Sequence, residues 1–333
     1  LEQQDWREFS PYQQQEKLQV YLKKDQLRGF QVTTAPLIRL AVIRTSDSIY
    51  QVIFTSHHIL MDGWSVPLIL KEVFAFYEAF STGKDLSLQP NRPYRDYIAW
   101  LKQQNLSQAE EFWHKQLQGF TTPTPLGNIA QPESFSKLEV GYGRQKISLC
   151  KSNTATLQSK VRQYGLTLNT LVQGVWALLL SRYSGREDVV FGATVSGRPP
   201  DLVGVESMIG LFINTIPIRL QVVPSASFWS WLQEIQEQSL QKRDYEYCSQ
   251  GQIHQWSDIP SSLPLYESIM VFENYPVDSS VLQSQNHNTN LLGFDSIGAQ
   301  TKYALTIMVV PGSQLEFFII YDKYRFDNPD INH

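Results

Sequence analysis

Cysteine is scarce in this chain, which has 333 residues and only two cysteines, Cys150 and Cys248. Two thiols cannot cross-link a fold of this size and match no zinc-ligand spacing, so we expect both to be reduced in a cytoplasmic protein. No apolar run approaches the roughly 20 residues of a membrane-spanning helix, and the first thirty residues contain no signal-peptide core. The net charge of −4 offers no basic field for nucleic acid or anionic membranes.

Apolar residues, by contrast, are plentiful: 42% of the chain is hydrophobic, 12% is aromatic and only 18% is charged. This composition predicts a folded protein, and the length favours two domains of roughly 100–200 residues each. The chain begins with Leu1 rather than Met, so we expect it to be a segment of a longer polypeptide.

The first third of the chain predicts a polar helix that ends at Gly29, then a hairpin of two strands over 36–43 and 48–56. Both faces of the second strand are apolar, which is typical of a central strand. A helix with Ser65 as its N-cap follows, and two more helices are expected over 94–104 and 107–117. Residues at helical spacing predict a core-facing stripe on the first of these helices: Ile69, Val73, Phe76 and Phe80.

The periodic pattern lapses over 119–138, a stretch with three prolines, and we place a linker there between domains at 1–118 and 139–333. Beyond it the pattern predicts alternating strands and helices, and hence an α/β layered architecture. The expected strands are 144–150, 188–195, 211–220, 267–275 and a hairpin of 304–310 with 315–321. The expected helices are one carrying Leu157, Val161 and Tyr164, one over 168–183 that is apolar all round and so buried, and one over 228–242.

One segment carries a chemical pattern, HHILMDG over 57–63. Strand parity would point His57 and His58 to opposite faces unless the strand has already ended. A neutral histidine near pH 7 can accept a proton from an attacking amine or alcohol, so acid–base chemistry at His58 is the favoured interpretation. The alternatives are core histidines beside an Asp-Gly turn, a metal site or a nucleophile triad. The remaining histidines show no paired metal-ligand spacing and no G-x-S-x-G motif is present, so we expect no metal.

This segment, read on as HHILMDGWS, resembles the HHxxxDG signature of condensation domains from nonribosomal peptide synthetases. Other stretches resemble that family in the same order, so the resemblance covers essentially the whole chain. They are YRDYIAW (94–100), SGRPPDLVGVESMIGLFINTIPIR (196–219), YEYCSQGQIHQW (245–256), LYESIMVFENYP (265–276) and YDKYRFDNPD (321–330). The family's N-terminal segment has no counterpart here, and the chain stops soon after the last stretch. We therefore expect a partial domain.

The resemblance implies two subdomains like chloramphenicol acetyltransferase, arranged in a V-shaped pseudo-dimer, with mixed sheets flanked by helices. It implies that a carrier-bound amine attacks a carrier-bound thioester at His58, the active histidine of the family, with His57 in support. His58 would act as a general base or as a group that positions the amine. Gly63 would let backbone approach the tunnel and offer its amide to the oxyanion, or would serve the turn alone.

Asp62 matches the structural aspartate of the family. As a buried carboxylate it needs a cationic partner, for which Arg198 is the first candidate and Arg219 the second. Removing Asp62 would then leave a buried cation uncompensated, at a cost of about 3–5 kcal/mol. Three further residues are candidates for the lining of the substrate tunnel: Trp64, Asn214 and Tyr275.

The implied partners are upstream and downstream peptidyl carrier domains, whose 4′-phosphopantetheine arms hold the substrates, and an adenylation domain of the same synthetase. No cofactor bound by the domain itself is expected, nor nucleic acid, nor a membrane. The Asp-Gly-Trp-Ser sequence and the 249–256 loop favour the subtype that joins an L-donor to an L-acceptor. The alternatives are an epimerization domain or another HxxxD acyltransferase, a non-catalytic recruitment module, and a truncated relic.

Overall fold

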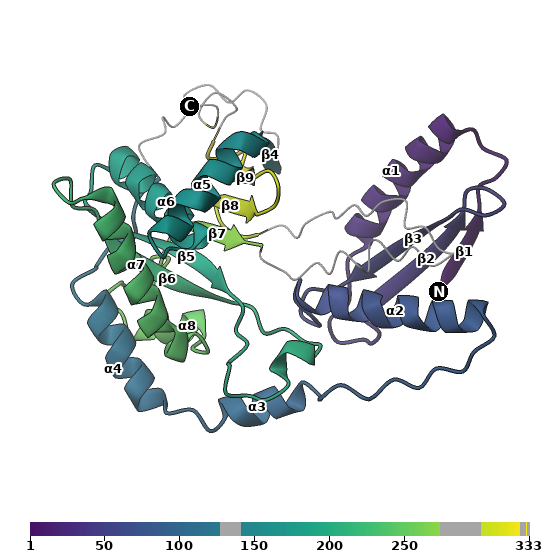
Figure 1. Cartoon of the computed structure of the whole chain (residues 1–333), viewed down its shortest axis with the longest axis horizontal. Coiled ribbons are helices and arrows are strands. Elements are labelled where there is room, and N and C mark those ends of the chain that lie inside the picture. Colours follow the sequence, from purple (N-terminus) through teal and green to yellow (C-terminus); the bar gives the residue numbers. More distant parts are fainter. Residues whose placement is uncertain (127–140, 274–300, 327–330, 332–333) are drawn as a thin grey trace. The chain divides into compact units, whose positions relative to one another are not determined.

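The computed structural model describes residues 1–126, 141–273, 301–326 and 331. The chain divides into two compact units, each with a β-sheet of its own (Figure 1). The first comprises Leu1–Leu70 together with Ile209–Leu211, and the second comprises Lys71–Met208 and Phe212–His333. This division differs from the boundary expected over 119–138, because the helices just before residue 119 belong to the second unit. Much of the proposed linker, 127–140, lies outside the described residues.

The first unit contains a three-stranded sheet in the order β1-β2-β3. Strand β1 (Glu2–Asp5) is parallel to β2 (Ile38–Arg44), and β2 forms an antiparallel hairpin with β3 (Tyr50–Ser56), with Val42 opposite Val52. Helix α1 (Pro11–Arg28) connects β1 to β2. It begins at a capping box between Ser10 and Gln13 and ends at Gly29, whose positive φ of 56° suits glycine. The predicted helix end and hairpin are confirmed, whereas β1 was not predicted.

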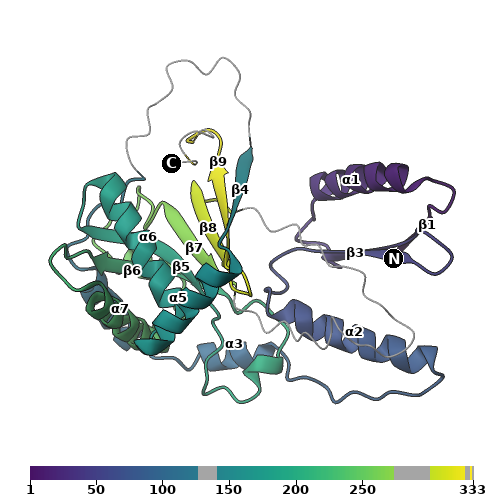
Figure 2. The same cartoon turned by 45° about the horizontal axis from the view of Figure 1, so that its top comes forward.

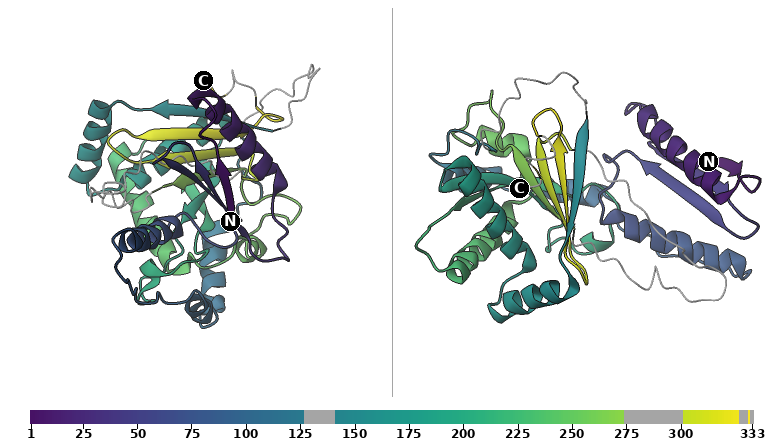
Figure 3. Two further views of the ribbon diagram at one scale, coloured as in Figure 1. Left: turned by 90° about the vertical axis from the view of Figure 1, so that its right-hand side faces the viewer. Right: turned by 90° about the horizontal axis from the view of Figure 1, so that it is seen from above.

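Helix α1 runs along one face of this sheet (Figure 3). On that face, Ala41 and Ile43 are buried, and Arg39 reaches Asp25 of α1 at 2.7 Å. Val52 and Phe54 point to the opposite face and remain 58% and 41% exposed. Strand β3 lies at an edge of the sheet formed by the described residues, whereas the pattern predicted a central strand. The two apolar faces of this strand indicate that both could be buried, but they do not show which strands or helices lie beside it.

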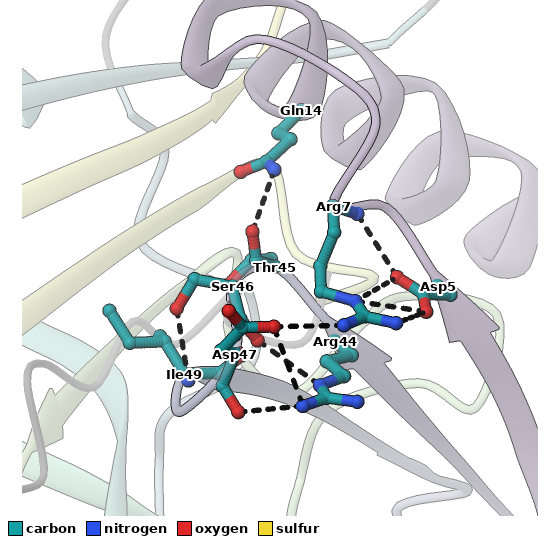
Figure 4. Close-up of polar contacts among 8 residues, drawn as sticks. All are labelled: Asp5, Arg7, Gln14, Arg44, Thr45, Ser46, Asp47 and Ile49. Atoms are coloured by element: carbon teal, nitrogen blue, oxygen red, sulfur yellow. Dashed lines mark hydrogen bonds and ion pairs between the residues drawn. The ribbon is translucent and has the colours of Figure 1, made fainter.

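Polar contacts hold β1 against the turn between β2 and β3 (Figure 4). The side-chain amide of Gln14 donates to the carbonyl of Thr45 at 3.0 Å, and Arg7 pairs with Asp5 and Asp47 at 2.7 and 2.8 Å. The ion pairs are exposed, so solvent screens them and they add little to stability. The contacts therefore fix the local geometry of the turn more than they stabilise the unit.

The second unit contains a six-stranded mixed sheet in the order β4-β9-β8-β7-β5-β6. β5 pairs with β7, and β7 with β8, in parallel, while the other neighbours are antiparallel. This sheet confirms the predicted α/β class with mixed strands. The strand bounds are β4 Tyr142–Ser148, β5 Asp188–Val195, β6 Asn214–Gln221, β7 Ser268–Phe272, β8 Leu305–Val310 and β9 Glu316–Asp322.

Helices α5, α6 and α7 lie together on one side of this sheet (Figure 2). They contribute to a core whose largest fully buried side chains include Trp113, Phe191, Leu232 and Tyr266. Of the helices, α8 was not predicted. The helix bounds are α2 Ser65–Ser81, which crosses from the first unit into the second, α3 Arg95–Leu101, α4 Leu106–Leu117, α5 Lys151–Gln163, α6 Leu168–Ser184, α7 Phe228–Lys242 and α8 Gln250–Gln255.

Two burial expectations are wrong. On α2, Val73 and Phe80 of the supposed core-facing stripe are 53% and 75% exposed, and the rings of Phe76 and Phe80 stack on each other. On α6, Val175 and Leu179 are 42% and 44% exposed although the helix is apolar all round. Periodicity identifies an apolar face, but burial also requires an element that packs against it.

Candidate active site

The two histidines of the motif lie in a turn, because β3 ends at Ser56. The backbone N–H of His57 donates to the Leu37 carbonyl at 3.0 Å, and the ring Nδ1 of His57 accepts the N–H of Ile59 at 3.1 Å. These bonds fix the start of the turn and give His57 a structural role. The parity argument does not apply here, since a side chain beyond the end of a strand no longer alternates.

His58 follows directly in this turn, and its side chain is exposed. A reactant therefore has access to the imidazole of His58. A ring sealed in the interior would have been incompatible with a catalytic role.

Asp62 closes the same turn and is 3% exposed. Its Oδ1 accepts hydrogen bonds from the backbone N–H and the hydroxyl of Ser65, at 3.0 and 2.9 Å. A carboxylate that accepts an N–H three residues ahead is the usual N-cap of a helix. Asp62 therefore caps α2, and the expectation that Ser65 is the N-cap is wrong. Gly63 and Trp64 form the turn between the cap and the helix.

Residues 209–211 lie in the first unit with the motif, although more than 140 positions separate the two in sequence. The backbone N–H of Asp62 donates to the Gly210 carbonyl at 3.1 Å. The hydroxyl of Ser65 lies 3.0 Å from the same carbonyl and 3.1 Å from the N–H of Gly210. Sequence reasoning missed this junction between the HHILMDGWS stretch and the SMIGLF stretch. The one signal for it was that both stretches belong to the family pattern.

Arg198 is nearly buried in the second unit, where it organises the chain just before residue 209. Its Nη1 donates to the carbonyls of Val205 and Met208, and its guanidinium carbon lies 3.9 Å from the centre of the Phe212 ring. The neighbouring Gly197 has a positive φ of 61°, and a Cβ there would collide with the Phe212 carbonyl. The ion pair of Asp62 with Arg198 stays a prediction.

Arg219, the second candidate partner of Asp62, is engaged elsewhere in the second unit. Its Nε and Nη2 donate to Asp188, the latter at 2.7 Å, and its Nη1 donates to the carbonyls of Gln116 and Gln118. These bonds engage all three guanidinium nitrogens of Arg219, and its pairing with Asp62 stays a prediction.

The side-chain amide of Asn214, expected at the tunnel wall, donates to the carbonyls of Glu246 and Cys248 at 2.7 and 2.6 Å. Asn214 therefore shapes the 246–248 loop, whatever else it contacts. Burial raises the pKa of Glu246; with an opposing effect of Arg243 and a smaller raising effect of Asp244, the pKa is about 7. Tyr275 lies outside the described residues.

Within the described residues, no group of three His, Cys, Asp or Glu side chains is placed to hold a metal ion. The same part of the chain contains no helix long and apolar enough to cross a membrane.

The fold of the chain is similar to the folds of several solved proteins. One is the first condensation domain of the calcium-dependent antibiotic synthetase, with a TM-score of 0.75 and 17% identity over 99% of this chain and 74% of that one. Another is the X-domain from teicoplanin biosynthesis, with a TM-score of 0.73 and 21% identity over 91% of this chain and 71% of that one. That X-domain has also been solved in a complex with OxyB. The fold is thus that of a condensation domain.

The condensation-domain family model matches residues 2–333, and the chain belongs to this family. Among its relatives is bacitracin synthase 3 of Bacillus licheniformis, which is 36% identical over 97% of this chain and is matched over 5% of its own length. A component of the linear gramicidin synthase of Brevibacillus parabrevis is 45% identical over 97% of this chain, and the match covers only 4% of that protein. The chain therefore spans a small part of the length of such multidomain relatives.

Proposed function

We propose that this chain catalyses peptide-bond formation between a carrier-bound donor acyl or peptidyl thioester and the amine of a carrier-bound acceptor aminoacyl thioester. The amine nitrogen attacks the thioester carbonyl, the carbon–nitrogen bond forms and the carbon–sulfur bond breaks. The proton lost by the nitrogen ends on the released phosphopantetheine thiol, so the step needs neither an oxidant nor a reductant.

The observation that carries this proposal is the exposed His58 in a turn anchored at both ends. His57 fixes one end of the turn to Leu37, and Asp62 fixes the other to Gly210. His58 is the catalytic residue, as a general base toward the amine or as a hydrogen-bonding group that positions the amine and the tetrahedral intermediate. Both roles use the neutral imidazole, and orientation of two tethered reactants supplies part of the acceleration.

The partners in this proposal are upstream and downstream carrier domains and an adenylation domain of one cytoplasmic synthetase. The family and the much longer synthase relatives support this context. The domain itself binds no cofactor and no metal, since the substrates arrive on phosphopantetheine arms. The donor and acceptor are both L-configured in this proposal.

The test loads one carrier domain with a donor peptide and another with an acceptor amino acid, adds the full polypeptide, and looks for the condensed product by mass spectrometry. We expect His58→Ala to lower the rate by about 100-fold or more. His114→Ala, which alters an exposed histidine of α4, serves as the matched control and should leave the rate unchanged. An equal rate for His58→Ala and the parent would remove His58 from the mechanism.

A second candidate is a recruitment module without turnover, favoured by the similarity to the X-domain that was solved with OxyB. In the same experiment, this alternative predicts no product from the parent protein while carrier binding is retained. Conversion of the donor residue to its D form would instead indicate epimerization.

A further inference from the structure

Ser65 is fully buried where α2 begins, and polar groups surround its hydroxyl. They include the Asp62 carboxylate at 2.9 Å, the Gly210 carbonyl at 3.0 Å and the Gly210 N–H at 3.1 Å. A hydroxyl has one proton to donate, so it cannot donate to the carboxylate and the carbonyl at the same time.

The surrounding bonds decide which acceptor receives this proton. The Gly210 carbonyl already accepts the backbone N–H of Asp62 at 3.1 Å. The carboxylate is the stronger acceptor, because a hydrogen bond to a charged group is shorter and stronger than a neutral one. Ser65 therefore donates to Asp62 and accepts from Gly210.

This arrangement links two segments that the chain order keeps apart. The hydroxyl connects the end of the His58 turn to residue 210, because it donates to Asp62 and accepts from the N–H of Gly210. Loss of the hydroxyl would remove two hydrogen bonds. The N–H of Gly210 would no longer donate to Ser65, and Asp62 would no longer accept from the Ser65 hydroxyl. Asp62 would keep the backbone N–H of Ser65, so the cap would weaken without disappearing.

We propose that Ser65 is a positioning residue for the reaction at His58: its hydroxyl fastens Asp62 to Gly210 and thereby fixes the end of the turn that presents the imidazole. The mechanistic part of this inference rests on the proposed condensation activity, whereas the anchoring part does not. A displacement of about 1 Å in a reacting group can cost about 100-fold in rate, so an anchor of this kind affects catalysis without contacting substrate.

The test compares Ser65→Ala with Ser65→Cys, which keeps the side-chain shape and a weak donor, in the full polypeptide. Ser81→Ala is the matched control, because Ser81 ends the same helix and its hydroxyl donates to the carbonyl of Glu78 within that helix. We expect Ser65→Ala to lower kcat by about 10- to 100-fold per folded molecule with little change in KM for either carrier. Ser65→Cys should fall between Ser65→Ala and the parent, and Ser81→Ala should match the parent.

A second readout is independent of activity. Hydrogen–deuterium exchange should become faster at 57–64 and 209–211 in Ser65→Ala and stay unchanged at β5. If exchange changes in this way but the parent protein makes no peptide, the anchoring role of Ser65 is supported and the proposed condensation function is contradicted. If the parent is active, and Ser65→Ala retains both its kcat and its exchange pattern, the positioning role of Ser65 is overturned. Uniform loss of protection throughout the variant would show a merely structural role and would also overturn it.

Discussion

Lys242 is a charged residue placed where charge is unfavourable. It ends α7, is 2% exposed, and within the described part of the chain its Nζ has no hydrogen-bond partner. Burial lowers the pKa of Lys242 to about 8. In the unfolded chain the ammonium is hydrated and keeps its ordinary pKa. Folding therefore carries a desolvation cost at this position whenever the lysine is protonated.

We predict that Lys242→Met raises the free energy of unfolding at pH 7, by an amount on the order of 3 kcal/mol. Between pH 8 and 10.5 the folded parent releases the proton that the unfolded chain still holds, so its own stability rises with pH. The advantage of Lys242→Met should therefore shrink over that interval. Thermal unfolding at pH 7 and pH 10 measures both effects, and a pH-independent difference would contradict the explanation.

At the scale of single elements, the loop that begins at Gly197 depends on backbone geometry more than on side chains. Gly197 has a left-handed φ of 61°, and any Cβ at this position would meet the backbone of Phe212. The left-handed φ disfavours an L side chain, and the nearby backbone of Phe212 leaves no room for one, so both features require glycine. Arg198 then packs over the ring of Phe212.

We predict that Gly197→Ala lowers the free energy of unfolding by about 2 kcal/mol or more, through strain and collision. Gly251→Ala is the matched control: Gly251 lies in α8 and a Cβ there would meet nothing within 4 Å. Alanine is the better helix former, so this control should be neutral or slightly stabilising. Denaturant unfolding distinguishes the two variants, and equal midpoints would disprove the role given to Gly197.

At the scale of the whole molecule, the two units differ in how completely their sheets are covered. In the second unit, β5 lies between β6 and β7, and Val189, Val190 and Phe191 are at most 1% exposed. In the first unit, β3 is an edge strand of the described sheet, with Val52 and Phe54 exposed. Opening of the first sheet therefore disrupts fewer buried contacts.

We predict that backbone amides of β3 exchange with solvent faster than those of β5 in the same sample. Hydrogen–deuterium exchange of the full polypeptide measures both, with β8, another internal strand of the second sheet, as the reference for slow exchange. Equal protection of β3 and β5 would show that the first sheet is covered as completely as the second.

The sequence alone determined the family, the α/β class and the strands and most helices of the second unit, α8 excepted, because these depend on local patterns and ordered motifs. It also identified His58 and Asp62 as members of one motif, since both lie within seven residues. The tertiary structure decided the rest: β3 ends before His57, Asp62 rather than Ser65 caps α2, and residue 210 meets the motif from a distant segment. Burial of the α2 stripe and the engagement of Arg219 likewise depend on which elements pack together. A side chain's hydrogen bonds and exposure are set by its neighbours in space, and one-dimensional periodicity does not specify those neighbours.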